Sequence, residues 1–394
     1  MNIKSITITS LLLITSIHYN NMKATGPVDF IDQPVERSLV FHPGEYDSRF
    51  YRIPAIVVAK NGDIVAVADK RIDSQRDLPG KIDIVCRRSS DGGKTWSPYS
   101  TVIAHDSIGG FGDPALVVDR KSGDILCIST HGNGLWQKTP GHIMVSRSTD
   151  NGLTWLPPVE ISDQLYNAPG APIQNVSGAF ASSGGALSTS SGRLMFVLVV
   201  RKAGEPRNAP FQCRAIFSDD SGHTWHVSPL WPATDSGDES KVVELADGSL
   251  VMSIRNRHSG HRLFSRSFDG GITWSSASEV SDLIDPACNG DILLYNRDGH
   301  DLLLQSLPGS PKKRVDVTVY ASKDNGATWP AARKITSGPT SYSAMTVLPD
   351  GSIGMLTEED TDLPGNPIAI WFNKIPLNHI LSGNDSPAQT SVNK

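Results

Sequence analysis

Two short patterns recur along the 394-residue chain and constrain its fold more than any other feature. The first, S-x-D-x-G-x-T-W, occurs as SSDGGKTW (89–96), STDNGLTW (148–155), SDDSGHTW (218–225), SFDGGITW (267–274) and SKDNGATW (322–329). Ser and Asp side chains bond nearby backbone N–H groups, and glycine adopts conformations that other residues resist. Each copy therefore predicts a compact turn whose tryptophan covers apolar surface.

The second pattern is a turn glycine followed by an apolar strand. Its six copies are NGDIVAVAD (61–69), SGDILCIST (122–130), SGRLMFVLV (191–199), DGSLVMSIR (247–255), DGHDLLLQS (298–306) and DGSIGMLTE (350–358). An apolar run such as IPAIVVAK usually precedes the turn, so each pair predicts a hairpin. A third strand precedes each eight-residue pattern and a short fourth strand follows it.

The repeated unit is therefore four antiparallel strands, and six units predict an all-β, six-bladed β-propeller. The sixth unit lacks an intact eight-residue pattern. We expect ERSLVFH (36–42) to supply its outer strand and close the ring, which leaves only short, protected edges. We assign residues 26–380 to this single propeller and residues 381–394 to a disordered C-terminal tail.

The rest of the sequence narrows the class of protein. The net charge is −5 and no basic run or zinc spacing occurs, so nucleic acid is not an expected partner. One lysine and about twelve mostly apolar residues near the N-terminus indicate a signal peptide within residues 1–25, hence an exported protein without an integral membrane segment. The four cysteines are far apart in sequence, and we expect buried free thiols.

The predicted topology separates structural from functional residues. The eight-residue patterns join strands three and four and so lie on one face of the ring, where their aspartates are turn formers. Polar residues at the start of strand one, the end of strand two or the loop after it meet on the opposite face. They are Arg52, Arg71, Asp77, Asp113, Glu239, Arg255, Arg314, Tyr342 and Glu358.

Three of these arginines, from blades one, four and five, are expected to face one space. Like charges placed together repel each other unless an anion binds there. Guanidinium groups match a carboxylate or phosphate with forked hydrogen bonds. Taken singly, each residue is more simply explained as a solvated or structurally paired strand end, so the prediction of an anion site depends on their convergence.

With these residues the chain resembles the bacterial exo-α-sialidases (neuraminidases) of the propeller type, over roughly residues 38–376. The resemblance rests on Arg-Ile-Pro at Arg52, the eight-residue patterns (Asp boxes), the spacing of Glu239 and Arg255, and Ser-Tyr-Ser around Tyr342 ahead of a DG turn. The chain has Tyr before Arg52, where the family often has Phe. The segment 171–185 should open the third blade but matches no pattern that we can align.

The resemblance implies a role for each residue. Arg52, Arg255 and Arg314 look like the triad that holds the sialic acid carboxylate, and Glu358 like the residue that braces Arg52. Tyr342 matches the nucleophile, Glu239 its base and Asp77 the acid and base of a retaining hydrolysis that needs no metal or other cofactor. Arg71 and Asp113 look like contacts to the 4-hydroxyl region. Trp136 is interpreted equally well as part of an N-acyl pocket or as a loop aromatic.

The implied substrates are sialylated glycoproteins, glycolipids or oligosaccharides, acted on by a monomer. A trans-sialidase or an intramolecular trans-sialidase would share the same nucleophile and triad, so these alternatives stay open. A non-catalytic propeller that binds sialoglycans is the alternative from another class. It would have no need of Tyr342, Glu239 and Asp77 together.

Overall fold

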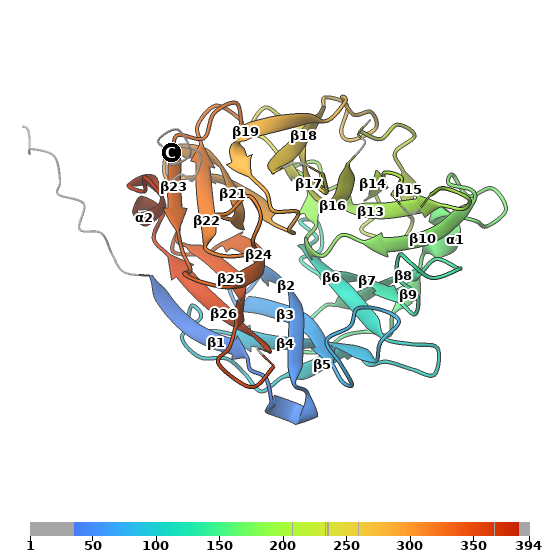
Figure 1. Cartoon of the computed structure of the whole chain (residues 1–394), viewed down its shortest axis with the longest axis horizontal. Coiled ribbons are helices and arrows are strands. Elements are labelled where there is room, and N and C mark those ends of the chain that lie inside the picture. Colours follow the sequence, from blue (N-terminus) through green and yellow to red (C-terminus); the bar gives the residue numbers. More distant parts are fainter. Residues whose placement is uncertain are drawn as a thin grey trace, which may run out of the picture. The chain divides into compact units, whose positions relative to one another are not determined.

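The computed structural model describes residues 35–206, 208–232, 234, 236–258, 260–365 and 367–385. The expected signal peptide lies outside these residues, as do positions 386–394 of the expected tail. The described chain forms six small sheets arranged around a central axis, as predicted (Figure 1). Within the part of the chain that the structure describes, no helix has the length and apolar composition needed to span a membrane.

The first three blades each contain four antiparallel strands in sequence order. Blade one contains β2 (Phe50–Val58), β3 (Ile64–Arg71), β4 (Ile82–Ser89) and β5 (Ser100–Ile103). Blade two contains β6 (Phe111–Val118), β7 (Ile125–His131), β8 (His142–Ser148) and β9 (Val159–Glu160). Blade three contains β10 (Val176–Ala181), β13 (Leu194–Lys202), β14 (Gln212–Ser218) and β15 (His226–Val227), so the segment 171–185 does open this blade.

The last three blades repeat the arrangement. Blade four contains β16 (Gly237–Glu244), β17 (Leu250–Asn256), β18 (His261–Ser267) and β19 (Ser278–Ile284). Blade five contains β20 (Asp291–Arg297), β21 (His300–Pro308), β22 (Val317–Ser322) and β23 (Ala331–Lys334). Blade six contains β24 (Thr340–Val347), β25 (Ile353–Asp360), β26 (Ile368–Ile375) and, from the N-terminal side, β1 (Glu36–Phe41).

The ring is closed by β1, which pairs antiparallel with β26 as expected (Figure 1). Two short strands depart from the regular pattern. β11 (Gly184–Gly185) pairs parallel with β6, and β12 (Leu187–Ser188) pairs with β13. Two α-helices, α1 (Ser162–Leu165) and α2 (Leu377–Leu381), and the 3-10 helix η1 (Glu45–Asp47) lie in connections or at the end of the chain.

The end of the described chain contacts blade five. Asn384 forms an isolated bridge with Ala332 of β23, and Asp385 N donates a hydrogen bond to Ala332 O at 2.9 Å. Residues 381–385, which we had assigned to the tail, therefore pack on the propeller.

The core consists of apolar clusters between neighbouring blades, because each sheet is buried on both faces. All four cysteines are free and buried, as predicted. The inner strands contact one another around the axis: β2 contacts β6 and β24, and β20 contacts β16 and β24.

The Asp boxes join the third and fourth strands and have one common structure. In the box of blade three, Asp220 Oδ1 accepts from Thr224 N at 2.9 Å, and Asp220 Oδ2 accepts from Thr224 Oγ1 at 2.6 Å. Gly222 has φ +84, and its N donates to Ser218 Oγ at 2.8 Å. Trp225 is buried in the core between blades two and three. The aspartates are thus turn formers, as the sequence indicated.

Replacing Asp220 with alanine is expected to lower Tm by a few degrees and to leave kcat and KM unchanged. The substitution removes the acceptor that closes the turn, which stabilises the fold without contacting the opposite face. Differential scanning calorimetry and a steady-state assay measure the two effects. Asp219→Ala, which removes only an exposed ion pair with Arg193, is the control and should change Tm less.

Candidate active site

Irregularities in the inner strands place polar side chains at one end of the axis. Register shifts occur between Arg52 and Ala55 in β2, between Gly112 and Ala115 in β6, between Gly237 and Ser240 in β16, and between Thr340 and Ser343 in β24. A bulge bends a strand and re-aims its side chains, and bulges are common beside active sites. The residues inside these four bulges include Asp113, Glu239 and Tyr342.

The backbone at two of these bulges is strained. Ile53 has φ +58 and Asp113 has φ +57, in the left-handed region that β-branched and other side chains resist. Each strained residue is held by a buried carboxylate: Ile53 N donates to Glu358 Oε1 at 2.6 Å, and Asp113 N donates to Asp69 Oδ1 at 3.2 Å. The strain is therefore maintained by hydrogen bonds that also fix the neighbouring site residues.

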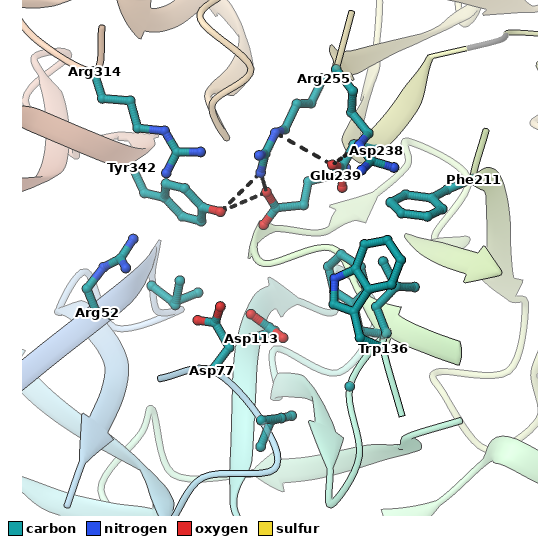
Figure 2. Close-up of a pocket in the computed structure, with 16 residues that line it drawn as sticks. Arg52, Asp77, Asp113, Trp136, Phe211, Asp238, Glu239, Arg255, Arg314 and Tyr342 are labelled. Carbon is teal, nitrogen blue, oxygen red and sulfur yellow. Dashed lines mark hydrogen bonds and ion pairs between the residues drawn. The ribbon is translucent and has the colours of Figure 1, made fainter. Parts of the chain in front are cut away.

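A pocket of about 340 Å³ opens on this face, within the range of small-molecule sites (Figure 2). It is lined by seven of the nine predicted site residues: Arg52, Asp77, Asp113, Glu239, Arg255, Arg314 and Tyr342. Segments from blades one, two, four, five and six thus meet at one cavity. No group of three or more His, Cys, Asp or Glu among the described residues is arranged to hold a metal ion.

Tyr342 and Glu239 form a direct hydrogen bond at the base of the pocket. Tyr342 Oη donates to Glu239 Oε2 at 2.9 Å, and Arg255 donates both to the same carboxylate oxygen and to Tyr342 Oη, the latter at 3.2 Å (Figure 2). Burial raises the pKa of Tyr342 well above its ordinary value, the charge of Glu239 raises it further, and Arg255 opposes both. The phenol is therefore neutral at neutral pH and has a proton acceptor in contact.

Three arginines surround the tyrosine (Figure 2). The guanidinium carbons of Arg52 and Arg314 lie 5.4 Å and 5.6 Å from the centroid of the Tyr342 ring. The ion pairs found among the described residues include Arg52 and Arg255 but not Arg314, whose Nη2 donates to the backbone oxygen of Ala287 at 2.9 Å. Positive charge therefore remains available on this side of the pocket for an anionic ligand.

Glu358 is fully buried and braces the first arginine. Its two oxygens accept from Arg52 Nε and Nη2, each at 2.9 Å, and from Ile53 N. Burial alone would raise the pKa of Glu358, but Arg52 outweighs that effect and holds the pKa below its ordinary value. Glu358 does not line the pocket.

Arg71 lies next to the pocket, in contact with Asp77. Its side chain is buried and does not line the pocket; it pairs with Asp77 at 2.8 Å and with Asp69 at 3.1 Å. The side chain of Asp77 is 79% exposed, so Arg71 holds an otherwise free loop carboxylate over the cavity. A direct contact between Arg71 and a ligand stays a prediction.

Two acidic residues near Arg71, Asp69 and Asp113, have raised pKa values. Burial raises the pKa of Asp69 to about 7, against the effect of Arg71. Burial also raises the pKa of Asp113, and the nearby charges of Asp69 and Asp77 add to it. This side of the pocket can therefore hold a proton on a carboxyl group near neutral pH.

Sequence reasoning missed the far wall of the pocket. Phe180, Phe211, Asp238 and Arg257 line it, and Arg257 stacks over Phe211 with its guanidinium carbon 4.0 Å from the ring centroid. Arg257 follows Arg255 by two residues, a spacing that was visible in the sequence. Phe211 had no such signal, because only the packing of blade three brings its loop to the cavity.

Trp136 is part of the same wall. It lines the pocket, is 42% exposed and meets Phe211 edge to face, with centroids 5.5 Å apart (Figure 2). Of the two interpretations left open for Trp136, the pocket-lining position is the one observed. Which group of a ligand it contacts stays a prediction.

Known proteins resemble this chain over most of its length. Residues 62–355 match the model of the BNR repeat-like domain. The chain is 34% identical over 339 residues to a sialidase of Micromonospora viridifaciens, covering 79% of this chain and 50% of that protein. It is 28% identical to a sialidase of Bacteroides fragilis, covering 81% of this chain and 62% of that protein.

A solved structure described as Hadza microbial sialidase Hz136 superposes with a TM-score of 0.77 at 29% identity, covering 87% of this chain and 69% of that one.

The chain spans about half to two thirds of the length of the sialidases of Micromonospora viridifaciens and Bacteroides fragilis. The match to the repeat model covers most of the propeller. The chain therefore belongs to the bacterial sialidase family built from BNR (Asp-box) repeats.

Proposed function

We propose that the protein is an exo-α-sialidase that releases terminal sialic acids from glycoproteins, glycolipids or oligosaccharides, with retention of configuration. The observation that carries this proposal is the Tyr342–Glu239 hydrogen bond at the centre of three arginines. We further propose that the protein is exported by its N-terminal segment and acts as a monomer without a cofactor.

The proposed nucleophile is a phenol because of the charge on the substrate. The anomeric carbon of sialic acid carries a carboxylate, which Arg52, Arg255 and Arg314 would bind. A carboxylate nucleophile would approach against that negative charge, whereas a phenol is neutral until it reacts. Sialidases with a tyrosine nucleophile are a known exception to the two-carboxylate rule of glycosidases.

The reaction would proceed in two steps. Tyr342 Oη attacks the anomeric carbon while Glu239 accepts its proton, and protonated Asp77 donates a proton to the departing glycosidic oxygen. Asp77 then removes a proton from water, which attacks the anomeric carbon. The bond to Tyr342 Oη breaks, and Glu239 returns its proton to that oxygen. The high exposure of Asp77 suits this second step, because water can reach it.

Hydrolysis of a fluorogenic α-sialoside, followed by NMR of the products, tests the proposal. Retention predicts that the α-anomer of free sialic acid appears first and then mutarotates. The β-anomer appearing first would contradict the tyrosine mechanism. A 2,7-anhydro product, or transfer to added lactose in place of hydrolysis, would indicate one of the two transferase alternatives, and binding without turnover would indicate a sialoglycan-binding propeller.

Replacing Arg314 with alanine is expected to raise KM for a sialoside by roughly 10- to 100-fold, because a charged hydrogen bond to the substrate carboxylate contributes about 1.5–3 kcal/mol. The effect should be smaller with an uncharged ester of the same sugar. Lys313→Ala removes an exposed charge from the same loop and is the matched control. Unchanged KM and kcat in Arg314→Ala would remove this residue from the triad.

A further inference from the structure

A buried lysine lies close to the Tyr342–Glu239 pair without lining the pocket. Lys241 of β16 is 2% exposed. Its Nζ donates to Asn289 Oδ1 at 2.8 Å and to the backbone oxygen of Gly290, and lies 3.9 Å from Asp291 Oδ1. Three oxygens thus face the three donors of an ammonium group. Lysines are almost never fully buried unless they are paired in this way.

This lysine reaches the proposed proton acceptor through one residue. Asn289 Nδ2 donates to Glu239 Oε1 at 3.3 Å and to Ser183 Oγ at 2.9 Å, and Ser183 Oγ donates to the same Glu239 oxygen at 3.5 Å. Tyr342 and Arg255 contact the other oxygen of Glu239. Both oxygens of the Glu239 carboxylate are therefore held. Lys241 fixes the amide of Asn289, which contacts Oε1.

The same lysine connects the two strands that carry the reacting pair. Glu239 precedes Lys241 by two residues in β16. Asp291 Oδ2 accepts from Met345 N at 2.6 Å, and Met345 follows Tyr342 by three residues in β24. Lys241 and Asp291 thus link β16 to β24 through the start of β20.

The end of the lysine side chain packs closely against β11. β11 contacts β2, β6 and β24, and its Gly184 lies against Lys241. A Cβ atom at Gly184 would lie 2.7 Å from Lys241 Cε and 2.9 Å from Nζ, closer than such atoms approach. A side chain at Gly184 would therefore displace the ammonium group, and the glycine leaves the space that Lys241 occupies.

Building on the proposed function, we propose that Lys241 is a positioning residue that keeps Glu239 directed at Tyr342. The amide of Asn289, held by Lys241, transmits the position to the carboxylate. Other charged or titratable groups also act on Glu239: Arg255 on β17, Tyr342 on β24, Asp113 on β6 and Asp238 beside it on β16. Lys241 differs from them because a ligand cannot reach it.

Lys241→Met, which keeps the length of the side chain and removes its charge, tests this role. We expect kcat to fall by roughly 10- to 100-fold, part of the ~10²–10⁴-fold that a positioned base contributes, with little change in KM. A fall in kcat without a matching rise in KM is what distinguishes a misplaced base from weaker substrate binding. Arg147→Met removes a partly buried, ion-paired cation from β8 and should leave both kcat and KM unchanged.

A second variant separates this role from simple loss of an ion pair. Lys241→Met alone leaves Asp291 buried and unpaired, which can reduce stability or prevent folding. The double variant Lys241→Met/Asp291→Asn removes both charges and should recover most of the lost stability while keeping the low kcat and the nearly unchanged KM. Wild-type kcat in either variant would overturn the proposal.

Crystal structures give a readout that does not depend on turnover. If the wild-type protein releases no sialic acid from the sialoside, the proposed function fails. The positioning role of Lys241 can still be tested, by comparing the place of Glu239 in the wild-type and variant structures. In the structure of the double variant we expect Glu239 to turn away, so that Tyr342 Oη and Glu239 Oε2 separate beyond 2.9 Å. An unchanged pair, with Asn289 in place, would overturn the inference.

Discussion

Tyr342→Phe is expected to lower kcat for an α-sialoside by roughly 10³-fold or more, while the protein keeps its fold and its affinity for the anionic sugar. The substitution removes one oxygen atom. That oxygen donates to Glu239 and accepts from Arg255 in the structure, and it is the atom proposed to attack the anomeric carbon. Steady-state kinetics with a fluorogenic sialoside, and calorimetric binding of free sialic acid, measure the two properties separately.

Tyr320→Phe is the matched control. Tyr320 of β22 is fully buried away from the pocket, and its hydroxyl is among the described buried polar atoms that have no hydrogen-bond partner. Loss of that hydroxyl should leave kcat unchanged. Near wild-type kcat in Tyr342→Phe would reject the nucleophile assignment, whereas equal losses of kcat in both variants would indicate a general effect of removing a buried hydroxyl.

The fold was predictable because it depends on local, repeated signals. Each Asp box closes its own turn with its own Ser, Asp, Gly and Thr, so five copies mark five strand connections whatever surrounds them. The second pattern marks six hairpins. If each blade has four strands, blade six needs an outer strand from elsewhere in the chain. Among the described residues, β1 is the one strand that precedes blade one, and it pairs with β26.

The site was predictable only in part. Residues at strand ends could be assigned to one face, and seven of the nine expected residues line the pocket. The sequence does not indicate how deeply a charged residue is buried. Arg71 was therefore expected at the surface of the pocket, although it pairs with Asp69 and Asp77 behind it.

Lys241 was overlooked for a related reason. It stands in the run DESKVVEL, where four consecutive polar residues precede two valines, and nothing in this run indicates that the lysine is buried. In the propeller this inner strand packs against β13 and β20 of the neighbouring blades, and Gly184 of β11 lies against Lys241. The charge therefore enters the core, and only the packing of several blades determines what it contacts.

Glu358→Gln is expected to lower the free energy of unfolding by about 3 kcal/mol at neutral pH and to raise KM. The buried carboxylate accepts hydrogen bonds from two nitrogens of Arg52, from Ile53 N and, at 3.2 Å, from Tyr342 N. An amide keeps one acceptor and turns two N–H groups toward these donors. Arg52 would lose its partner and Ile53 the bond that maintains its strained backbone, so substrate binding should weaken together with stability.

The pH dependence of this loss distinguishes a charge effect from a packing effect. The pKa of Glu358 in the folded protein lies below its ordinary value of 4.5. The ionised side chain therefore contributes its full stabilisation above pH 4.5. This contribution is lost as pH falls through the folded pKa. The stability difference between wild type and Glu358→Gln should therefore be largest at neutral pH and shrink below pH 4.5.

Urea unfolding at neutral pH and at a series of pH values below 4.5 measures this difference. Glu359→Gln is the matched control, since the neighbouring glutamate of β25 pairs with Arg37, whose side chain is 37% exposed, and such pairs contribute about 0–1 kcal/mol. A destabilisation by Glu358→Gln that stays constant with pH would mean that shape, and not charge, makes this residue necessary. Since the same carboxylate fixes Arg52, the backbone of Ile53 and that of Tyr342, its loss should then still raise KM.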